Sequence, residues 1–102
     1  MITVINRLTV HGDVPTFEQV LKGITAHMSG QPGFIGHRLY RSLRNPQVFI
    51  ETAQWTDAAS HRAAMQAEAF QEKVKDLGGL ATPEPDLFEI LEEDAPAPTE
   101  RA

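Results

Sequence analysis

The order of strand-like and helix-like patterns constrains the fold of this chain more than any other feature. Runs typical of strands occupy four segments, residues 2–10, 33–42, 47–55 and 86–92. An apolar stripe at helical spacing, from Phe17 to Met28, lies between the first two segments. A second helical region, which carries His61 and Phe70, lies between the last two. The order strand, helix, strand therefore occurs twice.

This order predicts an α+β fold, a ferredoxin-like split βαβ arrangement with an antiparallel sheet. The turn sequence LRNP separates residues 33–42 from residues 47–55, so we expect these strands to form a hairpin. Simple alternation places Phe34 and Tyr40 on the same face of the sheet. Both helical regions would cover one sheet face and leave the other bare. We therefore expect a homodimer in which two sheets stack, because a small domain cannot easily expose such a face.

Short polar segments mark the expected boundaries of the helices. Asp13 or Thr16 would cap the first helix, and Thr56 or Asp57 would cap the second. The segment GGLATPEP, residues 78–85, is expected to be a loop because it combines two glycines with two prolines. The last strand would then be short.

Length and charge narrow the class of protein. The chain has 102 residues, which suits one domain, placed at residues 1–92, and the Pro-, Ala- and charge-rich residues 93–102 are expected to form a disordered tail. The net charge of −5 argues against nucleic acid and anionic membrane surfaces as partners. No apolar run approaches the roughly 20 residues needed to cross a bilayer. There is no cysteine and no signal-peptide pattern, so we expect a cytoplasmic protein without cysteine-based metal sites.

Two polar residues stand at positions where the pattern calls for apolar side chains. Asn6 interrupts the apolar face of the first strand, and it either bonds to a loop or terminus or points into a ligand pocket. His61 lies on the inward stripe of its helix with Ala64 and Met65. It is either a half-buried packing residue or an acid/base group, since imidazole titrates near neutral pH.

Glu51 is the third polar candidate. It alternates onto one strand face with Phe49 and Trp55, where loss of solvent would raise the pKa of a carboxyl group and suit it to act as a general base. Alternatively it is solvated at the sheet edge or pairs across the hairpin with Arg38 or Arg41.

Other chemical motifs are missing from the sequence. The four histidines form no HxxxH or HExxH pattern, and no glycine-rich phosphate loop is present, so we expect no dedicated metal or nucleotide site. The alanine-rich stretch 58–69 faces Trp55 and Phe49 in this arrangement. Small side chains there predict a cavity for a flat aromatic ligand, although alanine also serves helix propensity alone.

Five short motifs together resemble the antibiotic biosynthesis monooxygenase family. They are NRLTV, QPGFIGHRLYRS, AQW, EAFQEKV and DLFEIL, in this order, and the resemblance covers about residues 2–92. It implies ferredoxin-like subunits that dimerise into an α/β barrel. Members of this family include small cofactor-independent oxygenases that convert polyketide anthrones or phenols to quinones, and also haem-degrading enzymes. The resemblance therefore implies one of these two activities.

The two branches of the family carry different pocket residues. In the quinone-forming branch, the resemblance aligns Trp55 with a pocket tryptophan, His61 with a tyrosine and Glu51 with an asparagine. In the haem-degrading branch, Asn6 matches a strand asparagine, but the tryptophan and axial histidine fall at Ala64 and Val74. The resemblance therefore disfavours haem, and we expect no cofactor.

The predicted function is a cofactor-independent monooxygenase that oxidises a small hydroxyaromatic, anthrone-type or phenolic substrate to a quinone with O₂. The expected catalytic residues are the base, His61 or Glu51, and the donors Asn6 and Trp55. The expected substrate contacts are Phe49, Ala64, Met65, Tyr40 and His37. The alternatives are a non-oxidative polyketide cyclase or isomerase, a haem-binding or haem-degrading protein, and a non-catalytic ligand-binding dimer.

Overall fold

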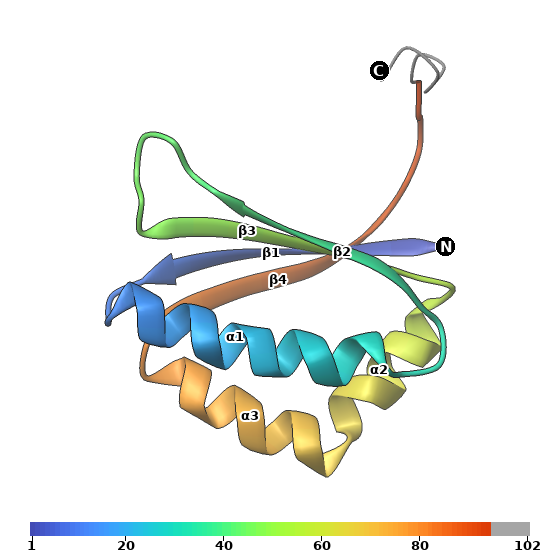
Figure 1. The fold of residues 1–102 in the computed structure, drawn as a ribbon. Coiled ribbons are helices and arrows are strands. Elements are labelled where there is room, and N and C mark those ends of the chain that lie inside the picture. The colour runs from blue at the N-terminus through green and yellow to red at the C-terminus, as the bar shows by residue number, and fades with distance from the viewer. Residues whose placement is uncertain (95–102) are drawn as a thin grey trace, which may run out of the picture.

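The computed structural model describes residues 1–94 as a four-stranded sheet with three helices (Figure 1). The elements are β1 (Ile2–Val10), α1 (Val14–Ser29), β2 (Phe34–Arg41), β3 (Val48–Trp55), α2 (Ala58–Gln66), α3 (Glu68–Gly78) and β4 (Ala81–Glu89). The strand order is β2-β3-β1-β4, and every neighbouring pair is antiparallel. The predicted ferredoxin-like α+β fold and its hairpin are confirmed. The predicted disorder of residues 93–102 falls, from residue 95 on, outside the described residues.

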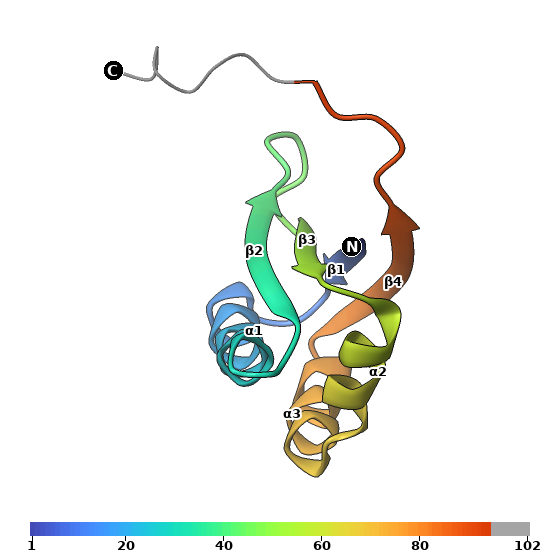
Figure 2. The ribbon, with the colours of Figure 1, turned by 90° about the vertical axis from the view of Figure 1, so that its right-hand side faces the viewer.

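All three helices lie on one face of the sheet, and the opposite face carries no helix (Figures 1 and 2). Strand alternation explains which side chains meet the helices. Leu8 of β1 and Phe49 of β3 are paired in register and point to the helical side, where the rings of Phe49 and Phe17 lie 5.0 Å apart. The core is completed by apolar residues from both layers: Val10, Leu21, Ile24, Leu77 and Ala81. None of the helices among the described residues is long and apolar enough to cross a membrane.

Two aspartates begin the first two helices. Asp13 accepts a hydrogen bond from the backbone N–H of Thr16 at 3.0 Å, and Asp57 accepts one from Ser60 at 2.7 Å. These bonds satisfy backbone donors that a helix start leaves without partners. They also lower the pKa of both carboxyl groups, through the Thr16 side chain and backbone for Asp13 and the Ser60 backbone for Asp57. Asp13 and Asp57 are therefore the caps.

The last strand differs from its prediction. β4 begins at Ala81 and ends at Glu89, so the expected loop over residues 78–85 is wrong for residues 81–85, and the expected span of 86–92 is too late. Pro83 and Pro85 are tolerated because β4 is an edge strand. A proline there lacks only an N–H that would point away from the sheet.

A β-bulge in β2 also changes what the alternation predicted. Phe34 pairs with Trp55 and Gly36 with Gln54, so one extra residue is inserted between them. Beyond this bulge His37 shares the helical face with Phe34, whereas Tyr40 pairs with Ile50 on the bare face. The predicted common face for Phe34 and Tyr40 is therefore wrong.

Candidate active site

A cavity of about 180 Å³ lies between the helical face of the sheet and the helices. Its wall is mainly apolar, with side chains from every helix and every strand. The polar or hydrogen-bonding side chains in this wall are Asn6, Thr25, His37, Glu51, Trp55 and His61. A small, largely apolar space with a few convergent polar groups is typical of a ligand site.

The register of β1 and β3 brings three of the predicted residues to this wall. Asn6 stands directly opposite Glu51, and Ile2 stands opposite Trp55. Even-numbered residues of β1 and odd-numbered residues of β3 share one face, so Asn6, Glu51 and Trp55 line the same cavity. The alternation read from the sequence is confirmed for this pair of strands.

Asn6 is held by the edge strand. Its side-chain oxygen Oδ1 accepts a hydrogen bond from the backbone N–H of Glu84 at 3.0 Å. The partner is thus a strand, and neither the loop nor the terminus considered from the sequence. With Oδ1 occupied in this way, the two N–H groups of the amide remain to donate to an acceptor in the cavity.

Trp55, His61 and Phe34 lie together in the cavity wall. The ring centroids of Trp55 and His61 lie 5.4 Å apart with planes at 66°, and Phe34 packs edge-on against Trp55 at 5.4 Å. Both Trp55 and His61 are buried, at 1% and 7% exposure. Such edge-to-face contacts fix the orientation of both rings.

His61 carries a buried polar atom without a partner. Its Nδ1 makes no hydrogen bond within the described residues. Burial lowers the pKa of His61, because loss of solvent disfavours the charged imidazolium. Nδ1 itself is buried, and a buried polar atom that makes no hydrogen bond costs free energy.

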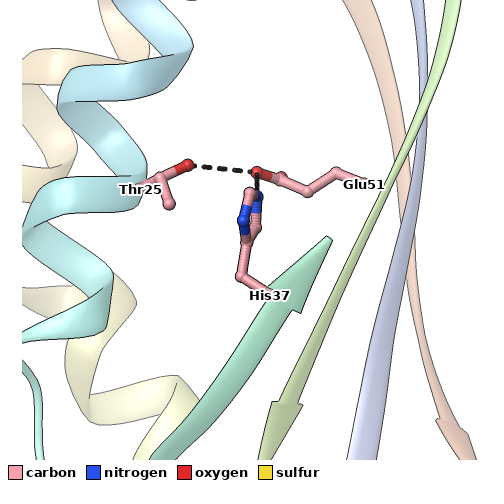
Figure 3. Close-up of polar contacts among 3 residues, drawn as sticks. All are labelled: Thr25, His37 and Glu51. Carbon is pink, nitrogen blue, oxygen red and sulfur yellow. Dashed lines mark hydrogen bonds and ion pairs between the residues drawn. The ribbon is translucent and has the colours of Figure 1, made fainter. Parts of the chain in front are cut away.

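Two side chains contact the same carboxylate oxygen of Glu51. Nε2 of His37 lies 3.0 Å from Oε2 of Glu51, and the hydroxyl of Thr25 donates to the same oxygen at 3.4 Å (Figure 3). The side chains of His37 and Glu51 are only 23% and 18% exposed. The carboxylate therefore stands between α1 and β2 and is directed into the cavity wall.

Neither arginine considered as a partner of Glu51 reaches it. Arg38 pairs with Thr52 on the bare face of the sheet. Arg41 donates through Nε to the carbonyl of Pro46 and lies over the ring of Phe49, 5.2 Å from its centroid. The His37 contact was not predicted, because it depends on the bulge in β2, for which the sequence offers only the nearby Gly36 as a signal.

The expected substrate contacts divide into two groups. Met65 and His37 line the cavity. Phe49 is 2% exposed and packs in the core against Phe17 instead, and Tyr40 is 48% exposed on the bare face. Ala64 belongs to a separate shallow hollow beside Gln31 and Pro32.

The cavity is thus not created by the alanine-rich stretch. Sequence reasoning missed the wall residues Thr25, Phe34, Pro83 and Pro85.

The family model for antibiotic biosynthesis monooxygenase matches residues 1–76, which include Asn6, Glu51, Trp55 and His61. The chain belongs to this family. A protein named deoxynogalonate monooxygenase, from Streptomyces nogalater, is 36% identical over 87 residues, covering 85% of this chain and 74% of the relative. The predicted family and the predicted enzyme class, a monooxygenase, are confirmed at this level.

Solved structures of similar proteins agree with the fold. SnoaB from Streptomyces nogalater, described as a cofactor-independent oxygenase, superposes with a TM-score of 0.87 at 34% identity, covering 90% of this chain and 94% of SnoaB. A conserved protein from Methanosarcina mazei superposes with a TM-score of 0.77 at 21% identity, over 85% of this chain and 89% of that chain. The second similarity concerns the fold alone.

Proposed function

We propose that this family member is a cofactor-independent monooxygenase that oxidises an anthrone or another hydroxyaromatic polyketide or phenol to a quinone with O₂. The observation that carries the proposal is the apolar cavity whose wall brings Asn6, Glu51, Trp55 and His61 together. The description of SnoaB as a cofactor-independent oxygenase and the name of the 36% identical relative support the same chemistry.

The substrate supplies the electrons in this reaction. Removal of one proton from an anthrone gives an electron-rich anion that reduces O₂ and forms a carbon–oxygen bond to the resulting peroxide. Loss of water from the hydroperoxide then gives the quinone carbonyl. One oxygen atom of O₂ enters the product, the other leaves as water, and the proton taken at the start returns to that water. The protein must supply a base, donors for the anionic oxygen and a cavity with little water.

In this proposal, four residues of the cavity wall share these tasks. Glu51 takes the proton, because its carboxylate is held at the wall by two hydrogen-bonding contacts. The amide N–H groups of Asn6 and the indole N–H of Trp55 donate to the anionic oxygens. His61 lines the cavity as a neutral ring and is not assigned the role of base, because its lowered pKa makes it a weaker base than an ordinary imidazole.

The decisive experiment measures oxygen uptake with dithranol as the anthrone. Chelator-treated, purified protein should consume one O₂ for each quinone formed, faster than dithranol oxidises by itself. Glu51→Gln, which keeps the shape of the side chain, should lose most of this rate with an unchanged circular dichroism spectrum. Product formation without oxygen uptake would favour the cyclase or isomerase alternative. A saturable Soret band on titration with haemin would favour haem binding, and no reaction with any anthrone or phenol would contradict the proposal.

We further propose that a second copy of this chain covers the bare face of the sheet. Tyr40 and Phe88 are 48% and 45% exposed on that face, beside Ile5 and Ile50. Light scattering should give twice the monomer mass, and Tyr40→Glu should shift the protein towards monomer. Leu43→Glu is the control, because Leu43 is equally apolar but lies in the hairpin turn. A monomeric wild-type protein at micromolar concentration would contradict this proposal.

A further inference from the structure

A second hollow of about 500 Å³ lies on the outer side of α1 and β2. It is more open than the cavity and carries charged side chains, including Glu18 and Lys22 of α1. We call this second hollow the outer groove. Thr25 and His37 line both the outer groove and the inner cavity. The two polar side chains that the hollows share are therefore the same two that contact Glu51.

Side chains from three elements form the wall between the inner cavity and the outer groove. Thr25 comes from α1, His37 from β2 and Glu51 from β3, and their polar ends meet at Oε2 of Glu51 (Figure 3). Among the described residues no hydrogen bond engages the other oxygen, Oε1, so one carboxylate oxygen remains for a ligand in the cavity. The partial exposure of His37 and Glu51, 23% and 18%, fits a wall that touches solvent on one side.

The bulge in β2 is what places His37 in this wall. In a regular strand that starts with Phe34 opposite Trp55, His37 would pair with Thr52 and face the bare side. The inserted residue moves His37 opposite Ala53, on the face that also carries Glu51. Bulges that redirect one side chain in this way are common beside active sites.

We propose that Glu51 and His37, positioned by Thr25, form a proton relay that joins the inner cavity to the outer groove. The carbon–hydrogen bond of the substrate breaks, and its proton binds to Oε1 of the Glu51 carboxylate. Rotation of the carboxyl group then brings this O–H to Nε2 of His37, in the tautomer that carries its hydrogen on Nδ1, and the proton crosses the 3.0 Å contact. His37 then releases its Nδ1 proton to water in the groove. The same route returns a proton when water leaves the hydroperoxide, so the overall reaction stays balanced. This relay rests on the function proposed above.

The relay moves the proton away from the substrate anion and places a positive charge nearby. A carboxyl group that keeps the proton beside the new anion can return it before O₂ reacts. Transfer to His37 creates an imidazolium paired with the Glu51 carboxylate, which moves the proton away from the substrate and offsets the charge of its anion. The charged groups that face His37 are Glu51 from β3 and, around the groove, Glu18 and Lys22 from α1. His37 is thus a relay and positioning residue that acts through Glu51.

The test compares His37→Ala with His11→Ala, which changes an exposed histidine just after β1. With dithranol, His37→Ala should lower kcat about a hundredfold with little change in KM, and added imidazole should restore much of the loss. Thr25→Val should lower kcat severalfold, and His11→Ala should match wild type. Wild-type kcat in His37→Ala, or a loss that imidazole does not restore, would overturn the relay.

A binding measurement that requires no catalysis can test the relay separately from the proposed monooxygenase activity. Trp55 is the only tryptophan of the chain, so quenching of its fluorescence reports binding of p-nitrophenol in the cavity. The absorbance of bound nitrophenolate then reports proton transfer to the protein. Wild type and His11→Ala should ionise the bound phenol more than His37→Ala and Glu51→Gln do. Equal ionisation in all four overturns the relay, whereas ionisation in wild type without any oxygen uptake overturns only the monooxygenase.

Discussion

His61 lies edge-on against Trp55, with ring centroids 5.4 Å apart and planes at 66°. The contact joins α2 to the end of β3 and buries both rings. His61 lines the cavity, and its buried Nδ1 makes no hydrogen bond within the described residues. This corner therefore differs from ordinary packing, because it holds a buried polar atom without a hydrogen-bond partner.

Trp55→Phe should separate the packing role of this residue from its role as a donor. Phenylalanine keeps an aromatic ring near Phe34 and His61 but has no N–H group. We expect kcat for dithranol to fall about a hundredfold, as is typical when one donor to a developing anion is lost. Stability, measured by urea unfolding with circular dichroism, should fall by less than the roughly 3–5 kcal/mol of a change to alanine. Undiminished kcat would contradict the donor role.

Asn6→Ala should show whether the amide does more than hold the edge strand. The variant removes the acceptor for the Glu84 N–H and the donors that face the cavity. The lost hydrogen bond should cost about 1 kcal/mol in the free energy of unfolding. The lost donors should lower kcat by about a hundredfold, far more than the change in stability explains. Asn45→Ala, in the hairpin turn, is the control and should leave kcat unchanged.

The burial of His61 should make stability depend on pH. Its folded-state pKa lies below the ordinary value of 6.5, so the unfolded chain binds the proton more readily. The stabilisation from this group is fully present above pH 6.5 and is lost as the pH falls through the lower folded-state pKa. Thermal unfolding from about pH 7.5 to about pH 5 should show this loss, reduced in His61→Gln but not in His11→Gln. Asp13 and Asp57 act at lower pH, because their pKa values lie below 3.8.

Gly33→Ala should damage the corner where β2 begins. Gly33 has a φ of 89°, and an added Cβ would lie 2.5 Å from Cβ of Ser60 at the start of α2. We expect a loss of about 1–3 kcal/mol or more in unfolding free energy. Gly23→Ala is the matched control, because Gly23 lies within α1 and its added Cβ meets no atom within 4 Å. That change should stabilise the protein by about 0.5–1 kcal/mol. Equal effects would contradict the role given to the φ angle.

Much of the site could be anticipated because alternation is local. Glu51 and Trp55 are four residues apart in one strand, so a period of two places both on one face whatever the strand pairs with. The same reasoning fails for Tyr40 and His37, since one inserted residue exchanges their faces. It fails for Phe49 in a different way. Its face was predicted correctly, but whether it lines the cavity or the core depends on Phe17 of the helix above it.

The sequence by itself determined the element order, the helix caps Asp13 and Asp57 as one of two choices each, and the strand face shared by Glu51 and Trp55. These features depend on residues within one or two turns of each other. Only the tertiary structure decided that Glu51 pairs with His37, because that contact needs a bulge, a hairpin register and a helix to coincide. Contacts between residues distant along the chain follow from how whole elements pack, and local patterns do not encode that packing.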